Sequence, residues 1–430
     1  MRAALWLLAL FGVAVAIALF AGNNQGTVTL YWPPYRIDLS LNLSLLLLAA
    51  VFVTLHAALR ALGLLLALPA EARRWRLQQK ERAMHHALLD GLTHVMAGRY
   101  LRARKAAGLA LAKEQALQEA GAPVPHGPQL RTLAHVVAAD SAHALQDRTQ
   151  RDQHLALGLE PNRLRATPTE QELHDGLLIR AARWRLDERD AAAALEQLRD
   201  LPQGPGRRTI ALRIKLKAAR LAGQTLSALE TARLLAKHRA FSSHAAHSIV
   251  RGLASELLRQ AHDPAQLSQV WHSLETSERA MPELTLEAAQ RLNQLGGSKA
   301  QVREWLLPIW ERWVAPGPSQ ERGQLDDALV LKLVQVLESA LDATADAWLA
   351  RIEAAREANP RDLRLQYLAG VACLQRQLWG KAQQLLGQCQ AQLQDSDLHA
   401  QALCHLATLA EQRGDTEAAA QAWKQAALLR

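Results

Sequence analysis

Residues 3–21 read AALWLLALFGVAVAIALFA and contain no charged side chain. A second apolar run covers residues 39–68 and carries one charge, Arg60. A helix of about 20 apolar residues crosses a bilayer core about 30 Å thick, so both runs are long enough. Lipid offers the backbone no hydrogen bonds, so each run is predicted to be a helix. The alternative for the first run is a cleavable signal peptide, which the poor cleavage site at residues 20–23 disfavours.

The charges beside the two runs predict their orientation. Arg2 precedes the first run, and five cations follow the second: Arg73, Arg74, Arg76, Lys80 and Arg82. The intervening loop carries only Arg36 and Asp38. Cytoplasmic flanks are rich in Lys and Arg, so we expect a two-pass protein with both termini in the cytoplasm and the loop outside. The basic segment after residue 70 is also expected to attract anionic lipid, at about 1 kcal/mol per residue.

The composition argues for a helical protein without a nucleic-acid partner. Aromatic residues make up 4% of the 430 residues, whereas Ala, Leu, Gln and Arg are abundant, which favours helix over sheet. The net charge of +9 invites a nucleic-acid interpretation. Much of this charge lies just after the second apolar run, however, and lacks the interleaved aromatics of single-strand binders. Cys373, Cys389 and Cys404 lie in apolar helical patterns and are predicted to be reduced thiols.

The region after residue 70 reads as helical hairpins joined by short loops. Residues 27–32 of the loop before it form an extended stretch that Pro33 and Pro34 end. Clusters of Pro and Gly break the later pattern at residues 121–128, 202–206 and 315–318. The sequence thus predicts three parts: a transmembrane hairpin at residues 1–70, degenerate helical hairpins at 71–315, and C-terminal repeats at 316–430.

Small residues recur at the spacing of a tetratricopeptide repeat, whose two helices approach closely where side chains are small. Twelve residues separate the members of three such pairs: Gly91 with Ala103, Gly370 with Ala382, and Ala407 with Ala419. Weaker copies centre on Ala191 and Ala228. We therefore predict an all-α fold, with the hairpin followed by a tetratricopeptide-like α-solenoid. An irregular helical bundle is the alternative.

Motifs for common chemistries are missing. The sequence contains no G-x-G-x-x-G after a strand, no P-loop and no H-E-x-x-H. The closest histidine pairs, at residues 85–86 and 244–247, have no further ligand at metal spacing. We expect no enzymatic activity and no catalytic, cofactor-binding or metal-binding residue. The recurrent tryptophans, Trp305 and Trp423 among them, are predicted to fill the core between hairpins rather than a ligand surface.

The register of the two C-terminal pairs defines a candidate groove for a partner protein or peptide. Six polar or amphipathic residues of the first helix in each hairpin are predicted to face the concave side: Arg364, Tyr367, Gln375, Gln401, Thr408 and Gln412. Tyr367 is the expected anchor, because aromatic residues are enriched at interfaces. Neither Tyr367 nor Arg364 is expected to fill a core position. The alternative is a simply solvated face.

The segment Gly26-Thr27-Val28, followed by residues 31–37 (YWPPYRI), residues 39–42 and an Arg-rich helix, resembles the proteobacterial HemY family. The resemblance implies a protein of the bacterial inner membrane that is associated with a late step of protohaem synthesis. We expect it to act there as a scaffold whose cytoplasmic repeats bind haem-biosynthesis enzymes. The flavin-dependent protoporphyrinogen oxidase of the same name needs a dinucleotide fingerprint that this sequence lacks. No motif supports direct binding of haem or porphyrin. The alternative function is a tetratricopeptide adaptor in envelope or lipopolysaccharide assembly.

Overall fold

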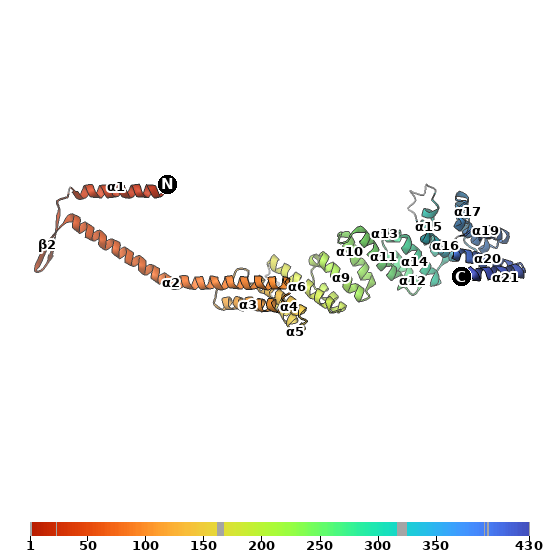
Figure 1. Ribbon diagram of the computed structural model, residues 1–430, viewed down its shortest axis with the longest axis horizontal. Coiled ribbons are helices and arrows are strands. Elements are labelled where there is room, and N and C mark those ends of the chain that lie inside the picture. The colour runs from red at the N-terminus through yellow and green to blue at the C-terminus, as the bar shows by residue number, and fades with distance from the viewer. Residues whose placement is uncertain are drawn as a thin grey trace. The chain divides into compact units, whose positions relative to one another are not determined.

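The computed structural model describes residues 2–22, 24–160, 167–315, 325–390, 392–393 and 395–429. These residues are almost entirely helical (Figure 1). The chain divides into two compact units, Met1–His174 and Asp175–Arg430, and the division falls within helix α6 (Pro168–Asp187). The boundaries expected near residues 70 and 315 remain predictions, and the predicted break at residues 316–318 lies outside the described residues.

The N-terminal unit begins with helix α1 (Arg2–Gly22) and a β-hairpin. Strands β1 (Thr27–Trp32) and β2 (Tyr35–Ser40) pair antiparallel, with Trp32 opposite Tyr35 at the turn. The extended stretch predicted at residues 27–32 is thus present, but the second strand was missed. The last two residues of β2, Leu39 and Ser40, belong in the sequence to the start of the apolar run. In the structure the Ser40 side chain accepts a hydrogen bond from the Leu43 amide, so Ser40 is the N-cap of the helix that follows.

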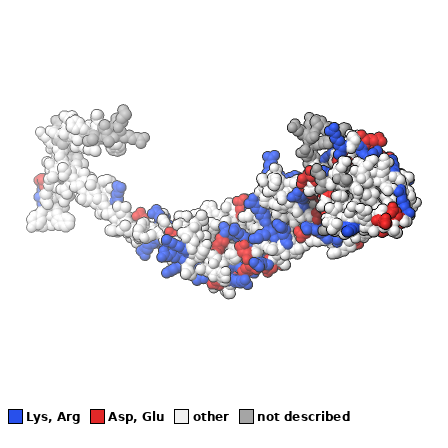
Figure 2. Space-filling view, turned by 45° about the vertical axis from the view of Figure 1, so that its right-hand side comes forward, with Lys and Arg blue, Asp and Glu red and all other residues white. Residues whose placement is uncertain are grey.

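Helix α2 (Leu41–Met96) is 56 residues long and continues through Pro69. Among the described residues it is the one helix long and apolar enough to cross a membrane, and a shorter apolar helix covers Leu8–Leu19. Figure 2 shows the first part of α2 almost free of charged side chains, with Lys and Arg gathering beyond it. A membrane-associated N-terminus is therefore supported, whereas the two-helix hairpin remains a prediction.

The rest of the N-terminal unit comprises α3 (Tyr100–Glu119), α4 (Gly127–Ala144), α5 (Arg148–Leu159) and the start of α6. Helices α3 and α4 pack against the end of α2, and α5 packs against α4. A Cβ atom on Gly91 would lie 3.3 Å from Val137 Cγ1 and 3.6 Å from the Ala103 carbonyl oxygen. Ala103 is fully buried. The predicted small pair therefore marks a real close approach of α2 and α3.

In the C-terminal unit, helices pack mainly on their neighbours in the sequence, giving a solenoid-like arrangement. The helices are α7 (Ala191–Arg199), α8 (Gln203–Gly206), α9 (Thr209–Leu221), α10 (Thr225–Lys237), α11 (Ser243–Arg259), α12 (Pro264–Ser273), α13 (Thr276–Arg279), α14 (Pro282–Gln294), α15 (Lys299–Val314), α16 (Asp327–Ala340), α17 (Asp346–Ala358), α18 (Leu363–Gln375), α19 (Trp379–Gln390), α20 (Ser396–Gln412) and α21 (Thr416–Leu429).

Small residues hold these hairpins together as expected. Ala382, Ala407 and Ala419 are buried, and Gly370 lies directly under Leu386 of the next helix. Trp305 is buried against Trp271, with ring centroids 4.9 Å apart.

The expectation for Trp423 was wrong. Its side chain is 41% exposed, and its indole N–H donates to Glu411 of the preceding helix at 2.8 Å. The ring therefore lies at the surface of its own hairpin instead of filling a gap between hairpins.

Candidate partner-binding groove

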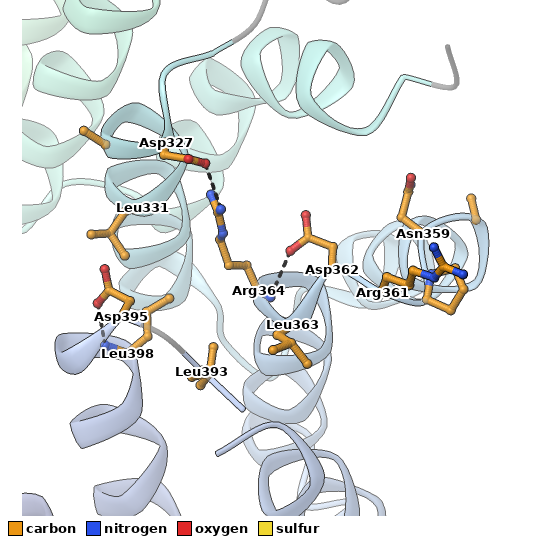
Figure 3. A pocket seen from close by; sticks show the side chains of 13 residues that line it. Asp327, Leu331, Asn359, Arg361, Asp362, Leu363, Arg364, Leu393, Asp395 and Leu398 are labelled. Carbon is orange, nitrogen blue, oxygen red and sulfur yellow. Dashed lines mark hydrogen bonds and ion pairs between the residues drawn. The ribbon is translucent and has the colours of Figure 1, made fainter. Parts of the chain in front are cut away.

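A groove of about 970 Å³ opens where α16, α18 and α20 begin. The loops that lead into α18 and α20 complete its walls (Figure 3). The lining residues are Asp327, Ala328, Leu331, Ala358, Asn359, Pro360, Arg361, Asp362, Leu363, Arg364, Leu393, Asp395 and Leu398. Three helices thus contribute their first turns to one depression in the C-terminal unit.

Two of the groove's carboxylates shape its walls. Asp362 accepts a hydrogen bond from the Arg364 amide at 3.0 Å. Asp395 accepts from the amides of Asp397 and Leu398, at 3.0 and 3.1 Å. Aspartate is a favoured N-cap because its oxygen satisfies amides that have no partner within the helix. These two side chains therefore fix the starts of α18 and α20.

Leucines provide an apolar surface between the acidic groups. Leu393 and Leu398 are buried, whereas Leu331 and Leu363 are partly exposed. Figure 3 shows Leu331 and Leu398 close to Asp395 and Leu393 below Arg364, with Asn359 and Arg361 farther away. An apolar surface with a few polar groups around it is the usual composition of a binding site.

Arg364 and Asp327 form an ion pair across the groove, at 2.8 Å. The Asp327 side chain is 88% exposed and that of Arg364 is 33% exposed. A pair this open to solvent contributes about 0–1 kcal/mol. A ligand that offers a cation to Asp327 and an anion to Arg364 could therefore replace the pair at little cost.

Tyr367 does not face the groove, contrary to the sequence prediction. Its side chain is fully buried, and its hydroxyl donates to Glu338 on α16 at 2.7 Å. The other carboxylate oxygen of Glu338 lies 2.7 Å from His405 Nε2 on α20. Burial, and then the Glu338 charge, raise the pKa of the Tyr367 phenol well above its ordinary value. Tyr367 fills a core position, so the expectation that its loss would leave folding intact was wrong.

The other predicted residues are dispersed. Gln401 Oε1 lies 3.4 Å from the Tyr367 hydroxyl, and Thr408 donates to the Cys404 carbonyl of its own helix at 2.9 Å. Gln375 is exposed, and Gln412 lines a separate cavity of about 210 Å³ with Trp379, Leu409 and Arg413. Of the six predicted residues, Arg364 alone lines the groove.

The sequence prediction missed the acidic and leucine residues of the groove. An available signal was the aspartate before each helix, Asp362 and Asp395, because N-caps mark where helices begin. The tetratricopeptide register identifies which residues lie on one face of a helix, and it does not identify the residues at the helix N-terminus. It therefore selected positions on α18 and α20 that lie beyond the groove.

Within the described ranges, no group of three or more His, Cys, Asp or Glu side chains could hold a metal ion. Cys373 and Cys389 are buried, and Cys404 is partly exposed. Burial raises the pKa of the Cys389 thiol to about 11, so it stays protonated and unreactive at neutral pH.

Comparison with known proteins gives one family. Residues 26–146 match the family model described as HemY protein N-terminus. The comparison with curated proteins gives no match. Among solved structures, a chain of "Structure of Naa15/Naa10 bound to HypK-THB" is similar with a TM-score of 0.25 and 12% identity. That match covers 76% of this chain and 56% of the solved chain, so the likeness spans about half of that chain's length.

Proposed function

We propose that the chain is a HemY-family protein, because residues 26–146 match the HemY N-terminus model, and that it is a membrane-anchored scaffold for a late step of protohaem synthesis. The family is associated with haem biosynthesis. The scaffold role, the binding of partner enzymes and the absence of catalysis are our proposal.

Helix α2 supports the anchoring. Its first part, residues 41–68, is apolar, and its C-terminal part packs against α3 and α4 of the N-terminal unit. We propose a two-pass arrangement in the bacterial inner membrane, with α1 as the other span and both termini in the cytoplasm. The cations after residue 70 support this orientation and offer contacts to anionic lipid.

Holding enzymes together at the membrane has a physical benefit in this pathway. Porphyrins are apolar, reactive and poorly soluble, so their escape into solution is costly. Tethering two enzymes to one scaffold raises the effective concentration of each near the other, to the millimolar range for short flexible linkages. Such a scaffold needs no catalytic residue of its own.

The groove at the starts of α16, α18 and α20 is the main support for the proposed binding of a partner protein. It combines leucines with the weak Arg364–Asp327 ion pair. An extended segment of a partner enzyme could place an apolar side chain on Leu331 and Leu363 and exchange its own charges for that pair. Apolar contact then supplies affinity, and the charges supply orientation.

Deletion and complementation test this function. Loss of the gene is expected to raise cellular porphyrin, because intermediates are no longer passed efficiently. The intact gene should restore the normal level, and a gene encoding Arg364→Glu should not. A deletion strain with normal porphyrin and defective lipopolysaccharide export would contradict the proposal and favour an envelope-assembly adaptor.

A further inference from the structure

Residues 201–255 carry the net positive charge of this chain. They contain ten Lys or Arg residues and one acidic residue, Glu230, which gives a net charge of +9. The whole chain also has a net charge of +9, so all its other residues together are neutral. Residues 201–229 alone hold six of these cations and no Asp or Glu. Such a block of like charge marks an electrostatic interaction surface.

Helix α9 presents part of this charge on one side. Its positions 210, 213, 217, 220 and 221 follow the spacing of three and four residues that brings side chains together on a helix face, and all five are exposed. Arg213, Lys217 and Arg220 occupy the middle, and Ile210 and Leu221, which are 52% and 57% exposed, lie at the two ends. We call these five residues the α9 stripe. The opposite face of α9 is buried and packs against α7 and α10.

The end of α10 and the loop after it add two cations beside the stripe. The Arg213 guanidinium donates a hydrogen bond to the Ala240 carbonyl oxygen at 2.9 Å and lies over the Phe241 ring, 5.7 Å from its centroid. These contacts hold residues 237–241 next to α9. Lys237 and Arg239 of this segment are exposed.

The cations of the stripe lack acidic partners. Farther along the chain, Arg233 and Arg251 form ion pairs with carboxylates of α13 and α14. Among the described residues, no carboxylate forms an ion pair with Arg213, Lys217 or Arg220. Like charges held together without counter-charges repel one another, so an anionic partner would relieve this repulsion.

We propose that the α9 stripe binds the anionic surface of the membrane that holds the N-terminal helices, which gives the C-terminal unit a lipid contact of its own. A bilayer with acidic lipid presents many negative charges in one plane, which suits cations spread along one helix face. Each Lys or Arg near such a surface strengthens binding roughly fivefold. Ile210 and Leu221 then reach the boundary between headgroups and acyl chains.

Other anionic partners fit the stripe less well. Single-stranded nucleic acid stacks its bases on aromatic side chains, and Phe241, the one aromatic residue in residues 201–255, already has Arg213 over its ring. A protein interface is centred on buried aromatic or apolar anchors, whereas the centre of this stripe is cationic. An anchored chain also stays at the membrane, so the lipid surface is present at high effective concentration.

A fluorescent probe in the full-length protein tests this contact. Ile210→Cys, labelled with an environment-sensitive dye, is reconstituted in phosphatidylcholine vesicles with or without phosphatidylglycerol. With phosphatidylglycerol at low salt, the emission should shift to the blue, and added salt should reverse the shift because it screens the charges. Leu378→Cys, just before α19, is exposed to a similar degree, 46%, and its probe should report water in both kinds of vesicle. The labelled original protein gives the background from Cys404.

Charge reversal identifies the residues that make the contact. Lys217→Glu combined with Arg220→Glu should abolish the blue shift of the probe at position 210. Lys299→Glu combined with Arg312→Glu changes the net charge equally at exposed positions of α15 and should preserve the shift.

Three results would overturn the lipid contact: no shift at position 210 with phosphatidylglycerol, equal shifts of both probes, or loss of the shift in both double variants. A shift that requires added cytoplasmic extract would also overturn it and assign the stripe to a soluble acidic partner. The readout involves no haem enzyme, so a negative result leaves the scaffold function standing.

Discussion

The Tyr367 hydroxyl donates a hydrogen bond to Glu338 at 2.7 Å, which joins α18 to α16 inside the C-terminal unit. His405 on α20 contacts the same carboxylate. A largely buried carboxylate is stable only when its oxygens are hydrogen-bonded, so these three helices depend on one another for their positions. The first turns of the same three helices line the groove, so this hydrogen-bond network helps to fix the shape of the groove.

Tyr367→Phe keeps the ring and removes only the hydroxyl. Leaving one Glu338 oxygen without its donor should cost about 1–3 kcal/mol of stability. The thermal unfolding midpoint of the full-length protein in detergent, followed by circular dichroism, should fall. Gln375→Ala, at an exposed position of the same helix, is the control and should leave the midpoint unchanged. Equal midpoints for both variants would show that the network does not stabilise the unit.

Gly370→Ala tests the close approach of α18 and α19. The added Cβ would lie 2.7 Å from Leu386 Cγ, so the Leu386 side chain or one of the two helices must shift. The expected destabilisation is about 1–3 kcal/mol.

Gly387→Ala is the matched control for that substitution, because nothing lies within 4 Å of the added Cβ. It should stabilise α19 by about 0.5–1 kcal/mol, since alanine is the better helix former. A Gly370→Ala variant as stable as the original protein would show that the hairpin register is wrong.

The N-terminal unit should lose stability in mild acid. Burial, followed by the nearby His154 and Arg131 charges, lowers the pKa of His135 to about 4. The unfolded chain takes up a proton below pH of about 6.5, whereas the folded form stays neutral until pH of about 4. Stability is thus complete above the unfolded pKa and falls between these values, by something on the order of 3 kcal/mol.

Unfolding followed at several pH values checks this dependence. His135→Gln removes the titrating group and should flatten the loss between pH of about 6.5 and 4. A smaller slope should remain, because burial also lowers the pKa of His154, whose Nδ1 atom lies 3.1 Å from His135 Nδ1. An unaltered slope in the variant would mean that His135 is accessible to protons in the folded state.

Reporter fusions test the two-pass arrangement. A phosphatase fused after Gln25 should be active, because the loop is expected outside, and one fused after Lys80 should be inactive. A fluorescent reporter that matures only in the cytoplasm should give the reverse pattern. Exported behaviour of the fusion after Lys80 would contradict the orientation derived from the flanking charges.

The helices and their close contacts could be predicted because they depend on local patterns. Gly370 and Ala382 appear in the sequence at a fixed spacing, and the structure packs both helices there. The apolar run at residues 39–68 likewise indicated α2. The second β-strand was not predictable in this way, because Leu39 and Ser40 suit a helix start as well as a strand end.

The groove was harder to predict, because it depends on three helices that are distant in the sequence. The register identified Tyr367 as a polar residue on an inner face. It could not show that Glu338, 29 residues earlier, supplies the partner that allows its burial. Asp327 and Arg364 are 37 residues apart, and their pairing depends on how α16 packs against α18.

The most direct test of the scaffold function is quantitative capture of the late haem-synthesis enzymes from membranes. The tagged full-length protein, crosslinked in native membranes, should enrich these enzymes over an untagged strain, as measured by mass spectrometry. Arg364→Glu, which reverses the charge that faces the groove, should lose them. Gln375→Glu places the same charge on the same helix away from the groove and should retain them. Equal yields from both variants would contradict binding in this groove.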